Sequence, residues 1–335
     1  MRADDDIIAA GGGLLDELTS IVSAAAAAIL AARAGSLEVR TKADLSPVTA
    51  CDHAAEAVIL EGLARLLPGV CVVSEEAAGR ALPDRIPGSF VLVDPLDGTR
   101  ELLAGRDEFT INVALVSGGR PRLGIVAAPA QGILWRGIEG RGAERLLLSP
   151  GAPANAAQER SAIRTRPSPR SGLVAVVSRS HLEPQTQAFL ARLPIADWRA
   201  CGSAVKFCQL AEGAADVYPR LSTTCEWDVA AGHALLVAAG GAVVSPEGAP
   251  LTYGRMLESF RVPAFVAWAT HRPPPGSMGP RLLKAPPADG EGAAFLSKVV
   301  APAGMGVRAM RPLRVAAPRP DCESAKPSVV AAVRS

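Results

Sequence analysis

Two aspartates that follow an apolar run are the residues of this sequence best suited to chemistry. The run Val91–Val93 leads directly into DPLDGT, in which Asp94 and Asp97 stand three residues apart with a proline between them and a glycine after them. On a sharp turn both carboxylates and the Leu96 carbonyl could reach one centre, and hard cations accept both kinds of oxygen. The segment indicates a cation site, although aspartates of this spacing are also typical of solvated turns.

The two residues that complete this segment could bind an anion. We expect Gly98 and Thr99 at the start of a helix, where backbone N–H groups bind phosphate well. Phosphate monoesters resist hydrolysis because water must attack an anion, and metal ions help by neutralising that charge and acidifying water. Such chemistry needs more carboxylates than DPLDGT supplies.

Further acidic segments accompany DPLDGT along the chain. They are KADLSPVTACD at Lys42–Asp52, SEE at Ser74–Glu76 and EWDVAAG at Glu226–Gly232. In this order the four segments resemble the inositol monophosphatase superfamily of lithium-sensitive, magnesium-dependent phosphatases, over about residues 14–269. Within that superfamily the chain is most similar to the CysQ-type 3'(2'),5'-bisphosphate nucleotidases, through SRSH at Ser178–His181, CGSAVKFCQLAEGAADVYPRL at Cys201–Leu221 and PLTYG at Pro250–Gly254.

The resemblance implies a site for two or three Mg²⁺ ions. Glu75, Asp94 and the Leu96 carbonyl would hold the ion that carries the attacking water. Asp94, Asp97 and Asp228 would hold the ion at the leaving oxygen. Taken alone, Asp228 is more typical of an ordinary helix N-cap, and the other motifs beside it favour the metal ligand.

The same resemblance implies a pair of residues that act on water. Asp52 and Thr99 would orient and deprotonate it, since the Thr99 hydroxyl can accept from water and donate to Asp52. Asp52 would also ligate a third, weaker magnesium ion. Glu75 is included among the catalytic residues because it holds the ion nearest that water.

A substrate with two phosphates needs a second anion site. Gly98 and Thr99 amides would hold the phosphate that is cut, beside Asp228. Ser203, Lys206 and Arg220 are the candidates for the other phosphate, and His181 for the base or ribose. Ser203 and Lys206 are three residues apart and are expected on one helical face, and an arginine can bind phosphate with a bidentate fork. Each of these residues, taken alone, is also typical of a solvated surface.

The expected activity is hydrolysis of adenosine 3',5'-bisphosphate to AMP and phosphate, which would clear a by-product of sulfate assimilation. The alternative is an inositol monophosphatase or another small-molecule phosphate monoesterase of the superfamily, because fold alone does not fix the substrate. A different class, a non-catalytic metal or nucleotide sensor, would be signalled by loss of Asp52, Thr99 or a metal ligand, and all of these are present.

The resemblance also implies the layered αβαβα sandwich, an α/β fold of the inositol monophosphatase and fructose bisphosphatase type. Hydrophobic spacing predicts helices over residues 14–34, 52–67, 203–212 and 228–239. Short apolar runs predict strands over residues 70–74, 90–93, 110–116, 122–128, 132–138, 174–177 and 242–244. The polar segment 151–170 is expected to be a surface loop.

Three regions are predicted: an N-terminal region over 1–150 with most metal ligands, a C-terminal region over 171–271 with the nucleotide contacts, and a disordered tail over 272–335. The tail holds ten Lys and Arg against four Asp and Glu, whereas the whole chain carries only +2. The rest of the chain is therefore slightly acidic, which suits a binder of anions only if metal cations supply positive charge. Nothing in this balance indicates nucleic acid.

The six cysteines form no CxxC pair, so reduced thiols and a cytoplasmic location are expected. The apolar run Ile21–Ala32 is too short to span a bilayer and is expected to be a buried helix. The basic tail leaves a peripheral contact at the inner membrane open, and a homodimer is left open too.

Overall fold

The computed structural model describes part of the chain, residues 11–35, 39–41, 47–78, 85–179 and 183–270. All of these lie in the first of two compact units, which spans residues 1–292. The tail predicted over 272–335 and the candidate His181 lie outside the described residues. The division of the folded part near residue 150 stays a prediction.

In the described residues the larger sheet has seven strands that follow the order of the chain. Its first two strands are parallel and all other neighbours are antiparallel. The strands are β3 (Cys71–Ser74), β4 (Ser89–Asp97), β5 (Thr110–Ser117), β6 (Arg120–Ala128), β7 (Ile133–Ile138), β8 (Gly142–Leu147) and β9 (Glu159–Ile163).

This sheet is buried on both faces. Along β4, Phe90 and Leu92 belong to one core cluster, whereas Val91 and Val93 belong to the other. Because side chains alternate between the two faces of a strand, an unbroken apolar run such as FVLV is what a doubly covered strand requires.

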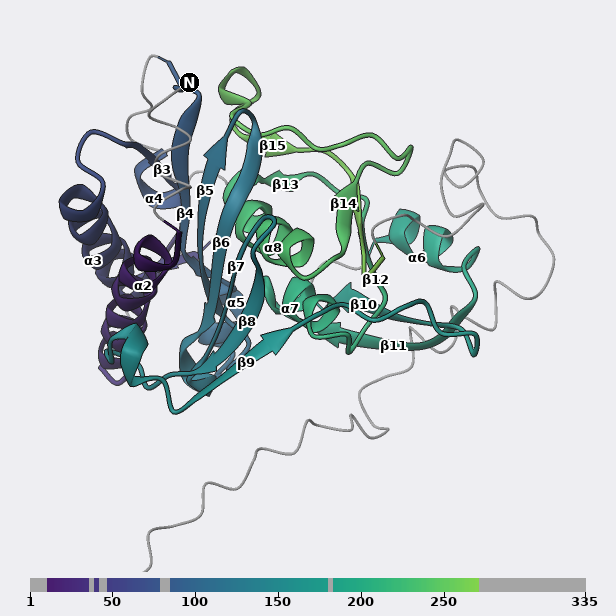
Figure 1. The fold of residues 1–335 in the computed structure, drawn as a ribbon, viewed down its shortest axis with the longest axis horizontal. Helices are drawn as coiled ribbons and strands as arrows, with labels where there is room; N and C mark the ends of the chain where they lie inside the picture. Colours follow the sequence, from purple (N-terminus) through teal and green to yellow (C-terminus); the bar gives the residue numbers. More distant parts are fainter. Residues whose placement is uncertain (1–10, 36–38, 42–46, 79–84, 180–182, 271–335) are drawn as a thin grey trace, which may run out of the picture. The chain divides into compact units, whose positions relative to one another are not determined.

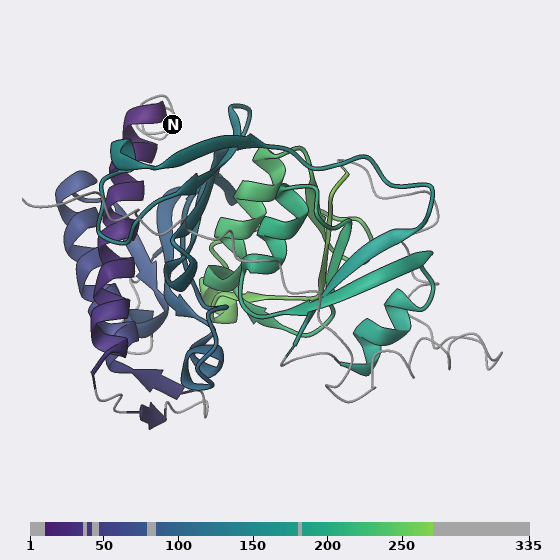
Figure 2. The same ribbon diagram turned by 90° about the horizontal axis from the view of Figure 1, so that it is seen from below.

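Two long helices cover one face of the sheet. Helices α2 (Gly11–Arg33) and α3 (Ala50–Leu66) lie side by side and enclose a core with that face (Figures 1 and 2). By length and hydropathy α2 could cross a membrane. Its apolar stripe, however, is buried against the sheet and α3, including Leu18, Val22 and Ile29, so the prediction of a buried core helix is confirmed.

The second sheet is separated from the first by two central helices. It has five strands in the order β11-β10-β12-β16-β14: Ile195–Cys201, Leu173–Ser178, Val217–Arg220, Phe265–Trp268 and Ala242–Val244. Helices α7 (Val205–Ala211) and α8 (Glu226–Ala238) pack between the sheets, and α6 (Pro184–Leu190) contacts the second sheet at β12 (Figure 1). The layers are therefore αβαβα, as predicted.

The remaining elements are short and several of them border the site. They are β1 (Val39–Thr41), β2 (Pro47–Thr49), α4 (Glu75–Ala78), α5 (Thr99–Leu103), β13 (Thr224–Cys225), β15 (Arg261–Val262) and the 3₁₀ turns η1 (Pro129–Gln131), η2 (Ala154–Ala156) and η3 (Met256–Glu258).

One prediction about the strands was wrong. The segment 151–170 is not all loop, because β9 pairs with β8 along the edge of the large sheet. The first four residues of β9 are exposed, so its sequence lacks the apolar alternation by which strands are identified. Backbone pairing alone places it in the sheet.

Helix α8 lies unusually close to the large sheet at Gly124 of β6. A Cβ atom at Gly124 would stand 2.9 Å from the Cβ of Ala234 and against the Ala231 carbonyl, both on α8. A side chain at this position would push the helix away from the sheet, and with it every residue on the first turn of α8.

Gly124→Ala is therefore expected to destabilise the protein by about 1–3 kcal/mol through overpacking. Gly13→Ala is the matched control, because a Cβ there meets nothing within 4 Å and alanine favours the helix. Thermal unfolding of the two variants checks this expectation. Equal stability of both would mean that α8 does not depend on the close contact.

Candidate active site

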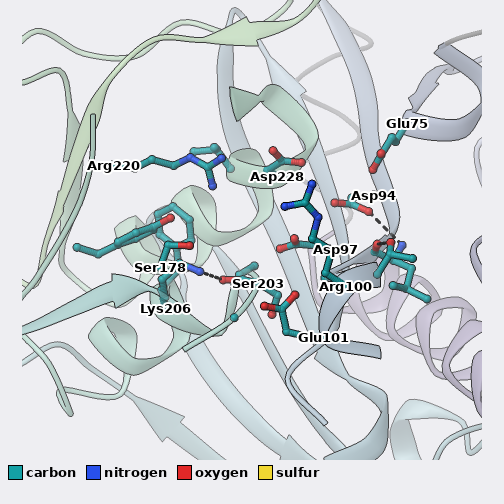
Figure 3. Close-up of a pocket in the computed structure, with 18 of the residues that line it drawn as sticks. Glu75, Asp94, Asp97, Arg100, Glu101, Ser178, Ser203, Lys206, Arg220 and Asp228 are labelled. Atoms are coloured by element: carbon teal, nitrogen blue, oxygen red, sulfur yellow. Dashed lines mark hydrogen bonds between the residues drawn. The ribbon is translucent and has the colours of Figure 1, made fainter. Parts of the chain in front are cut away.

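Three acidic side chains from distant parts of the chain converge at one end of the large sheet. Since β3 and β4 are parallel with Ser74 opposite Val93, Glu75 emerges beside Asp94. Asp94 continues the face of β4 that α8 covers, and Asp228 lies in the first turn of α8. Carboxylate oxygens of Glu75, Asp94 and Asp228 all lie within 4.8 Å of one another (Figure 3).

The backbone between Asp94 and Asp97 differs from the predicted sharp turn. Strand β4 continues through Asp97, with a shift of its register against β5 between the two aspartates. An irregularity of this kind re-aims side chains without ending the strand. The Leu96 amide donates to Asp94 Oδ1 at 3.0 Å and the Leu96 side chain is buried in the core, which fixes the position of Leu96 between the two aspartates.

Without a cation, the ionised form of these clustered carboxylates is energetically unfavourable. Burial raises the pKa of Asp94 well above its usual value, and the charges of Glu75, Asp97 and Asp228 raise it further. Burial and the Asp228 charge raise the pKa of Asp97 to about 6, although Lys206 and Arg220 pull the other way. Like charges held together out of water need a cation to remain ionised.

The residues present fit a hard divalent cation. The convergent donors of the cluster are carboxylate oxygens, the ligands that Mg²⁺ and Ca²⁺ take, whereas softer metals prefer imidazole or thiolate. Leu96 lines the same pocket. A bound cation would lower the raised pKa values of Asp94 and Asp97 and so keep both carboxylates ionised.

Removal of metal should change how stability depends on pH. Because the pKa of Asp97 is raised from 3.8 to about 6 in the folded protein, its contribution to stability is present below about pH 4 and is lost as the pH rises through about 6. Asp94 acts in the same direction. We expect chelator-treated protein to lose thermal stability from about pH 5 to about pH 7, and Mg²⁺ to restore more at pH 7. Equal restoration at both pH values, measured by thermal unfolding, would contradict the account.

Thr99 and Asp52 meet although they are far apart in sequence. The Thr99 hydroxyl donates to Asp52 Oδ1 at 3.2 Å, and its oxygen lies 3.4 Å from the Leu96 carbonyl oxygen. The other Asp52 oxygen accepts from the Thr49 amide at 2.8 Å and the Thr49 hydroxyl at 2.7 Å. The capping box of α3 thus holds Asp52 Oδ2 in place, while Asp52 Oδ1 faces Thr99.

The backbone turns sharply between Asp97 and Thr99. Gly98 has a φ of +99°, a conformation that side-chain-bearing residues rarely adopt, and it directly precedes α5. This turn brings Gly98 and Thr99 to the wall of the pocket.

The opposite wall of the pocket is basic. The pocket has a volume of about 220 Å³ and joins the acidic cluster to Ser203, Lys206 and Arg220 (Figure 3). Burial opposes the charge of Arg220, but the neighbouring Tyr218 and Asp228 raise its pKa above the usual value. Lys206 is buried, lies 5.3 Å from the centre of the Tyr218 ring and donates to the Ser203 carbonyl at 2.5 Å.

One local expectation about these residues was wrong, and the N-cap alternative for Asp228 does not hold. Ser203 does not share a helical face with Lys206, because α7 begins at Val205 and Ser203 has a φ of +47° in the turn before it. Asp228 is not the N-cap of α8; Cys225 is, and Asp228 accepts from the Cys225 amide at 3.1 Å. Both residues still line the pocket.

The pocket has further walls that the motifs did not assign. Glu101, Ser178 and Tyr218 line it. Glu101 lies two residues after DPLDGT, Ser178 begins SRSH, and Tyr218 lies in the segment Cys201–Leu221, but only the folded chain shows that they face the same space. The cysteines of the described chain are free thiols, and burial raises the pKa of Cys201 to about 11 and that of Cys225 to about 12, which keeps them protonated.

Comparison with known proteins identifies relatives of this chain. The model of the inositol monophosphatase family matches residues 14–270. The 3'(2'),5'-bisphosphate nucleotidase CysQ of Escherichia coli K12 is 39% identical over 231 residues, which cover 68% of this chain and 88% of that protein.

Solved structures share the fold. CysQ from Bacteroides thetaiotaomicron is 31% identical with a TM-score of 0.62, over 77% of this chain and 97% of that one. An inositol monophosphatase from Anabaena is 26% identical with a TM-score of 0.60, over 77% and 91%.

Proposed function

Because the chain belongs to the inositol monophosphatase family, we propose that it is a Mg²⁺-dependent phosphatase that hydrolyses adenosine 3',5'-bisphosphate to AMP and phosphate. One observation supports this above all: a single pocket has carboxylates that suit metal ions at one end and cationic side chains at the other. A substrate with one phosphate to be cut and another to be held matches that division.

Two or three Mg²⁺ ions would be held by Glu75, Asp94, Asp97, Asp228 and the Leu96 carbonyl, with Asp52 as the candidate for the third. When bound, Mg²⁺ neutralises phosphate charge, acidifies water and stabilises a leaving oxygen.

The chain's own residues supply the path of the proton. In the proposed mechanism the Thr99 hydroxyl accepts a hydrogen bond from the attacking water while donating to Asp52, so Asp52 receives the proton through Thr99. The bonds from Thr49 to the second Asp52 oxygen keep that carboxylate aimed at Thr99. The amides of Gly98 and Thr99 would hold the phosphate under attack.

Two buried polar atoms support a ligand at the basic wall. Within the described chain, neither the Ser203 hydroxyl nor the Arg220 Nε has a hydrogen-bond partner. Buried polar groups nearly always have partners, so orphans in a pocket call for a ligand or water. We assign the non-reacting phosphate to Ser203, Lys206 and Arg220, where the arginine adds a planar donor fork.

A parallel assay of phosphate release tests the proposal. With Mg²⁺ present we expect adenosine 3',5'-bisphosphate to be hydrolysed with a kcat/KM well above those for inositol 1-phosphate and fructose 1,6-bisphosphate, and we expect Li⁺ to inhibit. Preference for inositol 1-phosphate would keep the metal chemistry and reject the nucleotide. No release from any of the three would reject the enzymatic function.

A further inference from the structure

An ion pair between Glu108 and Arg179, neither of which lines the pocket, lies next to the turns that form its acidic and basic walls. Glu108 lies between α5 and β5, and Arg179 directly follows β10. The Glu108 carboxylate accepts hydrogen bonds from both terminal nitrogens of Arg179, with an Nη2–Oε1 distance of 2.8 Å. Burial alone would raise the pKa of Glu108, but the bonds from Arg179 and from the Gly202 amide lower it. The pair is therefore charged at neutral pH.

The side chains of Arg179 and Glu108 also bind the backbone of the segment from Ala200 to Gly202. Arg179 Nη2 donates to the Ala200 carbonyl at 2.9 Å, and the Gly202 amide donates to Glu108 Oε2 at 2.9 Å. The next residue is Ser203, whose left-handed φ carries a cost for a side-chain-bearing residue. The turn leads from the ion pair directly to the proposed binding residues Ser203 and Lys206.

The backbone of Glu108 also contacts the reacting half. Its carbonyl oxygen would lie 3.3 Å from a Cβ at Gly98 and 3.0 Å from a Cβ at Gly202, so it packs against both glycines. Gly98 belongs to the turn beside Asp97, and Gly202 to the turn before Ser203. One residue therefore contacts both walls of the pocket while its side chain lies beyond the pocket lining.

We propose that Glu108, through its ion pair with Arg179, is a positioning residue that sets the distance between the two phosphate subsites and thereby makes the enzyme selective for bisphosphates. The inference rests on the proposed function. It goes further in assigning selectivity to a residue that touches neither phosphate.

The chain offers a matched control for this ion pair. Asp216 accepts from Arg166 Nε at 2.8 Å and Nη2 at 2.6 Å, and also from the Val174 amide at 2.7 Å. This is the same combination of a guanidinium fork and one backbone amide on one carboxylate, but neither Asp216 nor Arg166 lines the pocket. The change in thermal stability of Asp216→Asn therefore measures what such an ion pair contributes to stability when it has no part in the pocket.

The experiment compares Glu108→Gln with Asp216→Asn on two substrates, adenosine 3',5'-bisphosphate and adenosine 3'-phosphate, which lacks the second phosphate. We expect Glu108→Gln to lose about 10- to 100-fold in kcat/KM for the bisphosphate, mainly through KM, as for a lost charged hydrogen bond. Adenosine 3'-phosphate should change little. Asp216→Asn should lower the melting temperature and leave the ratio between the substrates unchanged.

Arg179→Lys provides a second test, because lysine keeps the charge and loses the fork. Its loss should match that of Glu108→Gln, and the double variant should lose no more than either single one. Equal losses on both substrates, or an unchanged ratio in both variants, would overturn the inference alone. A wild-type enzyme that prefers no bisphosphate would overturn the proposed function, and the inference with it.

Discussion

Asp94→Asn should reduce kcat for phosphate release at least about 10³-fold, because metal ions contribute several kcal/mol to such a transition state. Asp94 is buried at the centre of the acidic cluster, and its oxygen lies within 4.8 Å of those of Glu75 and Asp228. Replacing it would remove the proposed shared metal ligand while keeping the size and shape of the side chain. Steady-state kinetics with saturating Mg²⁺ measures the effect.

The same substitution should stabilise the metal-free protein. Repulsion from Glu75, Asp97 and Asp228 contributes to raising the pKa of Asp94, and a neutral side chain relieves it. We therefore expect a higher melting temperature in chelator and a smaller gain on addition of Mg²⁺. Asp107→Asn is the control, since Asp107 is exposed and pairs only with Arg33 among the described residues. Undiminished activity in Asp94→Asn would remove the metal cluster from the mechanism.

Thr99→Val should lower kcat by about 10²- to 10⁴-fold, the range that positioned acid–base groups contribute. Valine matches threonine in shape but can neither accept from water nor donate to Asp52, which the Thr99 hydroxyl does at 3.2 Å. KM should change less than kcat, because the substitution leaves the basic wall of the pocket intact.

A double-mutant cycle separates this role from a general structural one. If Thr99 and Asp52 act as one unit, Asp52→Asn in the Thr99→Val background should cost far less than in wild type. Fully additive losses would mean that the two residues act independently. Thermal unfolding of all three variants distinguishes loss of fold from loss of chemistry, because Asp52 also caps α3.

The sequence predicts the large sheet well because its strands are apolar on both faces. Runs such as FVLV at Phe90–Val93 identify strands by themselves, and the acidic residues after β3 and β4 follow at the ends of neighbouring parallel strands. Strand β8 was missed because its segment GAERLL is only partly apolar, and β9 because an exposed edge strand has no alternating pattern.

The candidate site was predictable in part. The motifs gave the residues, but the meeting of Asp52 with Thr99, 47 residues apart, depends on how α3 packs beside β4. Ser203 was placed on a helix because its spacing from Lys206 fits one, whereas a left-handed turn precedes α7. The Glu108–Arg179 pair could not be found, since nothing in an isolated glutamate marks its partner 71 residues away.

The most direct test of the central claim follows both phosphates of adenosine 3',5'-bisphosphate by ³¹P NMR during turnover, with Mg²⁺ and with chelator. We expect that only the 3'-phosphate is released, that the product is adenosine 5'-phosphate, and that chelator stops the reaction. Release of the 5'-phosphate would reverse the assignment of the acidic and basic ends of the pocket. Turnover that continues in chelator would contradict the metal-dependent mechanism itself.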